Sequence, residues 1–403
     1  MNTLFFALTR ALRAHHWLRL LLCAFILSSL GNGLTQVLVF GLLLDWQASP
    51  STLTLAWVLA TLPGFVGSLV GERLCQRLSP YYLLILTETL GLVALTLPLL
   101  GILHHSITAL LLVQSVEALL GGMSWPALTL LFKRGLSERE LPAATAMENV
   151  IFASQVLLGT GIGVLLYGRV DPRVLLSVDA VSFLAAITLL ILTFFSSHAH
   201  HGEQHGKTEQ ASAVSWRQLN KSQKRSILIL PVLAAVGSPA MALLPALIQQ
   251  IQPDNATSLT LPLLFARSLG QLCGPLLLDG NKLSHYASRN RVLLMCLGIY
   301  LVSYGMVPQA SGELLAASGL IFVAHLASNI LFALGTFSLL AGFSAEQVSS
   351  ASARAWRWQT VTATVVTSLA AALASEWGAM QALYAVSLCT LLLSALLMHH
   401  YRQ

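Results

Sequence analysis

Long uninterrupted apolar runs constrain this chain more than any other feature of its sequence. Two examples are Leu20–Leu44 and Ile227–Ile248, and similar runs recur along all 403 residues. A helix needs roughly 20 apolar residues to cross a bilayer, whereas a strand of an outer-membrane barrel shows alternating segments of about ten. Only 9% of the residues are charged, against about a quarter in soluble proteins. The sequence therefore predicts an all-α membrane protein whose functional residues lie within the helix bundle.

The hydropathy pattern predicts twelve transmembrane helices. The expected spans are residues 19–44, 54–76, 81–103, 107–132, 142–167, 173–195, 226–250, 257–279, 290–308, 313–342, 349–374 and 378–398. An even number of spans places both termini on one side. If that side is cytoplasmic, the positions facing outward include only Arg169 and Arg173 among the basic residues, as the positive-inside rule predicts. The net charge of +6 therefore reports topology and does not indicate nucleic-acid binding.

The residues before the first span have two interpretations. No small-residue cleavage site follows the first apolar run, so we expect this run to be retained as an anchor. Ahead of it, Leu4, Phe5 and Leu8 are set against Arg10 and Arg13. This pattern fits either a helix lying on the inner membrane surface or a frayed extension of the first span.

One long polar stretch, residues 196–225, divides the chain into an N-terminal part, 1–195, and a C-terminal part, 226–403, with six expected spans each. Its composition is typical of a flexible cytoplasmic linker that buries no core. A metal-binding role is the alternative, because the stretch contains four histidines: His198, His200, His201 and His205. We favour a solvated linker and expect no metal and no cofactor.

Two six-span halves joined by such a linker resemble the major facilitator superfamily. Three runs are similar to signatures of its transmembrane secretion effector branch, which includes enterobactin-type siderophore exporters and macrolide-efflux relatives. These runs are Ser28–Gln36 in the first span, Leu141–Ala146 at the start of the fifth and Val178–Leu184 in the sixth. The resemblance implies the major facilitator fold and export by alternating access.

The loop between the second and third spans departs from the family pattern. Relatives carry G-x-x-x-D-R-x-x-R-[RK] there, and the acid and bases of this motif close the cytoplasmic gate. In this chain either Gln76 takes the acid position beside Arg77, or the acid and base are displaced to Glu72 and Arg73. All four residues are therefore gate candidates.

Ionisable residues within spans are the best site candidates, because a charge at the centre of a spanning helix costs about 2.5–3.5 kcal/mol. We expect Glu117 to carry the coupled proton. Glu148 is either a second proton site or the partner of a gate arginine. Glu88 lies in a span that is peripheral in the resembled fold, where pairing between helices is expected, and Asp179 is expected to brace a neighbouring helix.

Polar residues at helical spacing predict the substrate-binding surface. Three pairs lie four residues apart and so share a helix face: Asn32 with Gln36, Arg267 with Gln271, and His325 with Asn329. Arg357 joins them as a seventh candidate. Guanidinium groups hold carboxylates well, which favours an anionic substrate. The alternatives are that the amides merely join neighbouring helices, that a buried acid neutralises an arginine, and that Arg357 belongs to the gate.

These features predict a proton-coupled secondary active exporter in the bacterial inner membrane, with both termini cytoplasmic. The expected cargo is a small polar or amphiphilic molecule, either a siderophore, with the anionic carboxylate type favoured, or a drug. The expected partners are this substrate, protons and lipid, and we expect a monomer. An importer of a small nutrient anion is the alternative. A membrane-embedded enzyme is less favoured, because neither H-E-x-x-H nor G-x-S-x-G occurs.

Overall fold

The computed structural model describes residues 3–200, 212–251, 256–310 and 312–401. Within these ranges the regular secondary structure is helical, and Thr3 and Asp279 form an isolated antiparallel bridge. Nine helical segments in this part of the chain are long and apolar enough to cross a bilayer. The all-α prediction is therefore confirmed for the described residues.

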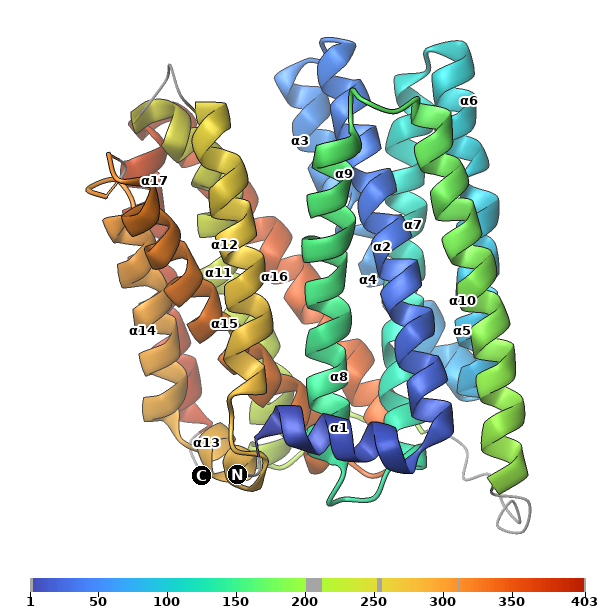
Figure 1. Ribbon diagram of the computed structural model, residues 1–403. Coiled ribbons are helices and arrows are strands. Elements are labelled where there is room, and N and C mark those ends of the chain that lie inside the picture. Colours follow the sequence, from blue (N-terminus) through green and yellow to red (C-terminus); the bar gives the residue numbers. More distant parts are fainter. Residues whose placement is uncertain (1–2, 201–211, 252–255, 311, 402–403) are drawn as a thin grey trace.

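The helices form two groups that lie side by side (Figure 1). The N-terminal group comprises α1 (Leu4–Ala14), α2 (His16–Asp45), α3 (Pro50–Leu59), α4 (Pro63–Cys75), α5 (Pro80–Ala94), α6 (Thr96–His104), α7 (Ile107–Gly135), α8 (Leu141–Ser154), the π-helix η1 (Gln155–Thr160), α9 (Gly161–Leu166) and α10 (Pro172–His200). The C-terminal group comprises α11 (Lys221–Ile251), α12 (Ala256–Leu276), α13 (Leu283–Ser288), α14 (Asn290–Met306), α15 (Leu314–Gly342), α16 (Val348–Trp377) and α17 (Ala379–His400), with the short 3₁₀ turns η2 (Trp216–Gln218) and η4 (Gly280–Lys282).

The two groups contact each other through a few long helices. In the C-terminal group α16 packs against α4 and α7, while α12 and α15 pack against α8. The short helix α1 and the C-terminus of α17 lie at the same end of the bundle (Figure 1). We call this end the terminal end.

Each expected span coincides with a helix or with consecutive helices, and local sequence explains the breaks. Pro63 begins α4 and separates it from α3, because proline fits the first turn of a helix but not its interior. Ser49 and Ser106 accept hydrogen bonds from backbone N–H groups at the starts of α3 and α7. The helices α12, α14 and α16 are not among the nine apolar segments, so the number of crossings stays a prediction.

The end of the 196–225 stretch that the structure describes, from residue 212 on, is packed against the helices, whereas a solvated linker was expected there. The helix α10 continues to His200, and α11 begins at Lys221. Between them Val214 and Leu219 are buried, as is Arg225 at the start of α11. Backbone hydrogen bonds fix residues 212–214 near the start of α16: the Ser212 N–H donates to the Glu346 carbonyl at 2.8 Å, and the Val214 N–H donates to Ser350 Oγ at 3.0 Å. The histidines His201 and His205, and the side chains of His198 and His200, lie outside the described residues.

Candidate functional site

A cavity of about 460 Å³ lies between the two groups, away from the ends of the long helices. Its size falls within the range of small-molecule binding sites. Its aromatic lining comprises Phe152, Phe183, Tyr300, Phe332 and Trp356. Its other polar lining residues are Asn32, Gln36, Thr61, Thr87, Glu88, Gln114, Glu117, Ser124, Gln155, Ser238, Gln271, His325, Ser328, Asn329, Gln359 and Thr360. Both groups of helices therefore contribute to one amphiphilic site.

The wall formed by the N-terminal group carries two carboxyl groups. Glu88 on α5 and Glu117 on α7 both line the cavity, together with Gln114, one turn before Glu117. Three buried atoms of these side chains have no hydrogen-bond partner within the protein: Glu88 Oε2, Glu117 Oε1 and Gln114 Nε2. Buried polar atoms are nearly always paired, so unpaired ones facing a cavity mark groups available to a ligand or a proton. Asn32 and Gln36 lie on the same wall.

A third acid, Asp179 on α10, joins helices behind this wall. Its carboxylate accepts hydrogen bonds from the hydroxyl groups of Thr35 on α2 and Ser182 on its own helix. A Cβ atom at Gly31 would lie only 2.0 Å from both Asp179 Oδ1 and Ser182 Oγ. The small residues of the first span therefore admit a polar brace between α2 and α10, and Asp179 does not line the cavity.

The opposite wall is built by the C-terminal group around His325 on α15. Its Nε2 atom is 2.7 Å from the hydroxyl of Tyr304 on α14. Asn329 donates through Nδ2 to the His325 carbonyl at 3.1 Å, and Tyr300 donates to the carbonyl of Gly237 at 2.9 Å. His325 Nδ1 and Gln271 Oε1 are buried without a partner. This wall therefore offers imidazole, amide and hydroxyl groups, several of them held in place by hydrogen bonds.

The two arginines expected to bind substrate do not line the cavity in this conformation. Arg267 lies one turn before Gln271 on α12, and its Nε atom is buried without a hydrogen-bond partner. No acid in the described part of the chain forms an ion pair with it. Arg357 instead pairs with a gate candidate. Of the seven expected substrate residues, the cavity brings together Asn32, Gln36, Gln271, His325 and Asn329.

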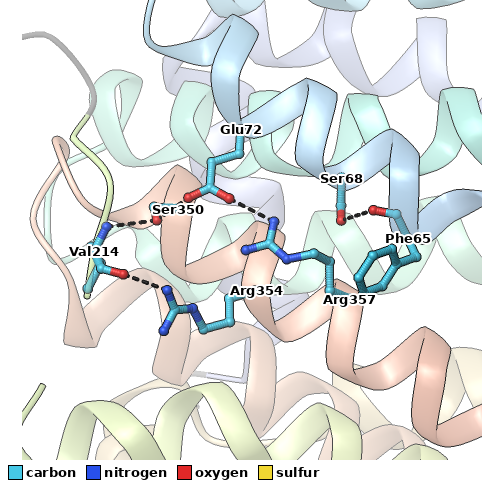
Figure 2. A network of polar contacts seen from close by, with 7 residues as sticks. All are labelled: Phe65, Ser68, Glu72, Val214, Ser350, Arg354 and Arg357. Atoms are coloured by element: carbon cyan, nitrogen blue, oxygen red, sulfur yellow. Dashed lines mark hydrogen bonds and ion pairs between the residues drawn. The ribbon is translucent and has the colours of Figure 1, made fainter. Parts of the chain in front are cut away.

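On the terminal side of the cavity, Glu72 and Arg357 join the two groups of helices. Arg357 on α16 donates through Nη1 to Glu72 Oε2 on α4 at 2.7 Å, and the side chains are only 10% and 13% exposed. Ser350, two turns earlier on α16, donates its hydroxyl to the other oxygen of the same carboxylate. Figure 2 shows both contacts converging on Glu72. A hydroxyl and a guanidinium thus bind one acid across the interface.

The segment before α11 is part of the same network (Figure 2). The Val214 backbone N–H donates to Ser350 Oγ at 3.0 Å, and Arg354 donates to the Val214 carbonyl at 2.6 Å. The Trp216 ring contacts the Trp358 ring, with centroids 4.7 Å apart. We name Glu72, Val214, Ser350, Arg354 and Arg357 the terminal latch.

The remaining gate and proton candidates lie outside both the cavity and the latch. Arg73 and Arg77 are exposed, and Gln76 caps the C-terminus of α4. Glu148 on α8 is 2% exposed, its Oε2 atom is unpaired, and Thr336 on α15 interacts with its side chain. Glu148 therefore lies at the interface between the groups, on the terminal side.

Sequence reasoning missed three features of the site. It assigned Glu88 to helix pairing, whereas Glu88 lines the cavity. Tyr300 gave no signal, because a tyrosine within an apolar run resembles a packing residue. The bond between Arg354 and Val214 spans 140 residues of sequence, and no local pattern indicates such a pair.

A model of the Major Facilitator Superfamily matches residues 21–279, more than half of the chain. The chain belongs to the Major Facilitator Superfamily. It is accordingly a multi-pass membrane protein with a transporter fold, not an enzyme.

Solved structures of transporters share this fold at low sequence identity. A bacterial homologue of the iron transporter ferroportin, in an outward-facing state, is 14% identical with a TM-score of 0.70, over 95% of this chain and 98% of that one. The human organic anion transporter MFSD10 (TETRAN) is 13% identical with a TM-score of 0.68, over 94% and 98%. The E. coli fucose:proton symporter FucP is 13% identical with a TM-score of 0.62, over 95% and 98%. These likenesses show the fold alone.

A curated relative is similar over a short stretch. The uncharacterized 29.9 kDa protein in the crtE 3′ region of Pseudescherichia vulneris is 61% identical over 74 residues. The match spans 18% of this chain and 27% of that protein. It therefore carries no information on substrate or direction.

Proposed function

We propose that this chain is a proton-coupled secondary active exporter of a small amphiphilic molecule in the bacterial inner membrane. The observation that carries the proposal is the cavity between the two groups of helices, where Glu88 and Glu117 each present an unpaired, buried carboxylate oxygen. Such a site binds cargo, and its acids can exchange a proton for it. Twelve spans, arranged as six in residues 1–195 and six in 226–403, would rock about this site, with both termini cytoplasmic and the chain acting as a monomer.

Glu117 is the proposed proton carrier. An ionised carboxylate within a spanning helix is costly unless a partner compensates its charge. Protonation removes that cost when the cavity is empty, and a bound substrate that supplies hydrogen bonds or positive charge favours release of the proton. This competition couples proton movement to substrate movement, because Glu117 binds either the proton or the substrate at a time.

Charge in the cavity bears on the class of cargo. Glu88 and Glu117 line it, whereas no lysine or arginine of the described residues does. A siderophore or a drug is proposed as cargo, and this lining supports a neutral or cationic amphiphile better than the anionic carboxylate type that Arg267 suggested. The aromatic rings of Phe152, Phe332 and Trp356 would contact the apolar part of such a molecule.

Export as the direction of transport follows from the resemblance of Ser28–Gln36, Leu141–Ala146 and Val178–Leu184 to the siderophore and macrolide exporters. The terminal latch supports alternating access. It joins the two groups of helices on one side of the cavity, through side chains and the backbone of Val214. These bonds can break and re-form as the groups rock.

The first prediction concerns proton exchange in inside-out vesicles energised to acidify their interior. Adding a transported compound should release protons and restore the quenched fluorescence of acridine orange. We would screen tetraphenylphosphonium, a macrolide, a catecholate siderophore and a citrate-type siderophore. The Glu117→Gln variant should lose proton release while still binding the active compound.

The matched control is Glu313→Gln, which neutralises an exposed acid outside the cavity and should keep full activity. Proton release by Glu117→Gln at the unaltered rate would exclude Glu117 from coupling. Compound-dependent uptake into energised whole cells, instead of extrusion from them, would exclude export.

A further inference from the structure

The helix α1 does not continue the first long helix but lies across the terminal end of the bundle (Figure 1). Only His15, in an extended conformation, separates Ala14 at the end of α1 from His16 at the start of α2. Since α2 is an apolar segment of 30 residues that can span the bilayer, α1 lies where that helix leaves the membrane. Its direction is therefore that of a helix in the membrane surface.

The inner face of α1 is fixed to the bundle. Leu4 is fully buried, Leu8 is 6% exposed and Ala11 is 2% exposed. The three residues follow helical spacing, and they pack against α8 of the N-terminal group. This packing leaves the opposite face of α1 uncovered by the protein.

The outer face combines aromatic and basic side chains. Phe5 and Phe6 are 50% and 47% exposed, and Arg10 and Arg13 are both exposed. Exposed phenylalanines are unfavourable in water but stable at the boundary between lipid headgroups and acyl chains, where nearby arginines reach phosphate groups. Arg19, exposed at the start of α2, adds a third positive charge near this face. The chemistry of the outer face thus complements a bilayer surface that contains anionic headgroups.

The two ends of α1 are attached to different groups of helices. At its start, the Leu4 backbone N–H donates to the Leu278 carbonyl at 2.8 Å, and Thr3 forms the isolated bridge with Asp279. Both partners follow α12 of the C-terminal group. The start of α1 is therefore bound to the C-terminal group through backbone hydrogen bonds.

At the other end, His15 forms a 2.7 Å contact with Glu140, which precedes α8 of the N-terminal group. The Ser137 hydroxyl donates to the same carboxylate at 2.7 Å. Partial burial alone would raise the pKa of Glu140, but the hydrogen bonds from Ser137 and His15 outweigh it and hold the pKa below its usual value. The carboxylate therefore stays charged at neutral pH.

We propose that α1 is a clamp held in place by membrane lipid. Anionic headgroups bind its outer face and hold it in the position that joins the two groups of helices at the terminal end. The clamp works in parallel with the terminal latch, since both attach the N-terminal group to the C-terminal group on the same side of the cavity. Lipid composition would then regulate how readily that side opens. The proposal depends on α1 lying at a membrane surface and not on the identity of any cargo.

Disulfide trapping of the bridge measures the clamp directly. The full chain carrying Thr3→Cys and Asp279→Cys would be placed in nanodiscs of phosphatidylcholine, with or without 20% phosphatidylglycerol, and the rate of cross-linking followed. Phosphatidylglycerol should raise the rate of cross-linking. Removing both charges with Arg10→Gln and Arg13→Gln should weaken the apparent affinity for this lipid, measured by titrating it, roughly thirty-fold.

The matched control is Arg289→Gln with Arg291→Gln, which removes two exposed arginines near the start of α14 at the same end and should leave the lipid effect intact. An equal lipid response in the Arg10/Arg13 variant would overturn the proposal, as would a parent chain that ignores phosphatidylglycerol. Inorganic phosphate reproducing the effect in phosphatidylcholine would also overturn it, because a free anion would then suffice. The readout does not involve transport, so it can fail independently of the proposed function.

Discussion

The cavity and the latch differ in whether their polar side chains have hydrogen-bond partners within the protein. In the cavity, Glu88, Glu117 and His325 each keep at least one buried polar atom without a protein partner. In the latch, Arg357 and Ser350 satisfy both oxygens of Glu72. The first arrangement is ready to bind, and the second is already bound. Glutamates that are partly or fully buried thus serve two purposes, because their partners differ.

The ion pair between Glu72 and Arg357 can be tested by removing each charge in turn. Removing one member of a pair that is largely buried leaves the other charge uncompensated, so Glu72→Gln and Arg357→Gln should each destabilise this conformation. The double variant should lose less stability than the two single variants lose together, and the difference, the coupling energy, should be about 0.5–3 kcal/mol. Thermal unfolding of the four chains in detergent measures this coupling. Strictly additive losses would mean that the two side chains do not interact in the dominant state.

At the scale of helices, close backbone contacts hold α4 against α7. A Cβ atom at Gly67 would lie 1.9 Å from the Leu119 carbonyl oxygen, and one at Gly122 would lie 2.2 Å from that of Gly64. Glycine allows the backbones of spanning helices to approach in this way. These contacts set the distance between the helix that carries Glu72 and the helix that carries Glu117. We therefore expect Glu72 of the latch and Glu117, the proposed proton carrier, to move as one unit.

A substitution in this contact tests how tightly α4 and α7 pack. Gly67→Ala should force α4 and α7 apart and lower stability by about 1–3 kcal/mol, the usual cost of overpacking. Gly121→Ala on α7 is the matched control, because its Cβ would meet no atom within 4 Å. Thermal unfolding followed by size-exclusion chromatography compares the two variants. Equal stability would show that the α4–α7 contact is looser than described.

The order of the helices could be predicted from sequence better than their interior breaks. Continuous apolar runs located α2, α7 and α15 within a few residues. The π-helix η1 could not be located, because an irregular turn depends on packing: Gly159 lies against Gly33 of α2. The burial of Val214 could not be predicted either. It depends on backbone hydrogen bonds to Ser350 and Arg354 of α16, which the polar composition of the segment does not indicate.

Across the whole molecule, the two six-span halves seen in the hydropathy were enough to predict the superfamily, and the match to residues 21–279 confirms it. The transmembrane secretion effector branch stays a prediction. The candidate site was predicted in part. Helical spacing predicted two pairs of cavity residues, Asn32 with Gln36 and His325 with Asn329, because residues four apart share a helix face. Of the third pair only Gln271 lines the cavity. The positions of Arg267, Arg357 and Glu88 depend on which helices are neighbours. A single sequence does not carry that information.

Access to the cavity from each side of the membrane shows whether Glu72 and Arg357 close it on the terminal side. Gly121→Cys places a thiol in the lining with open space around it. A membrane-impermeant maleimide should label it slowly from the terminal side and faster from the opposite side, after subtraction of labelling in the parent chain. Adding Glu72→Gln should increase labelling from the terminal side. Fast labelling from that side with the latch intact, unchanged by Glu72→Gln, would contradict a cavity closed by Glu72 and Arg357.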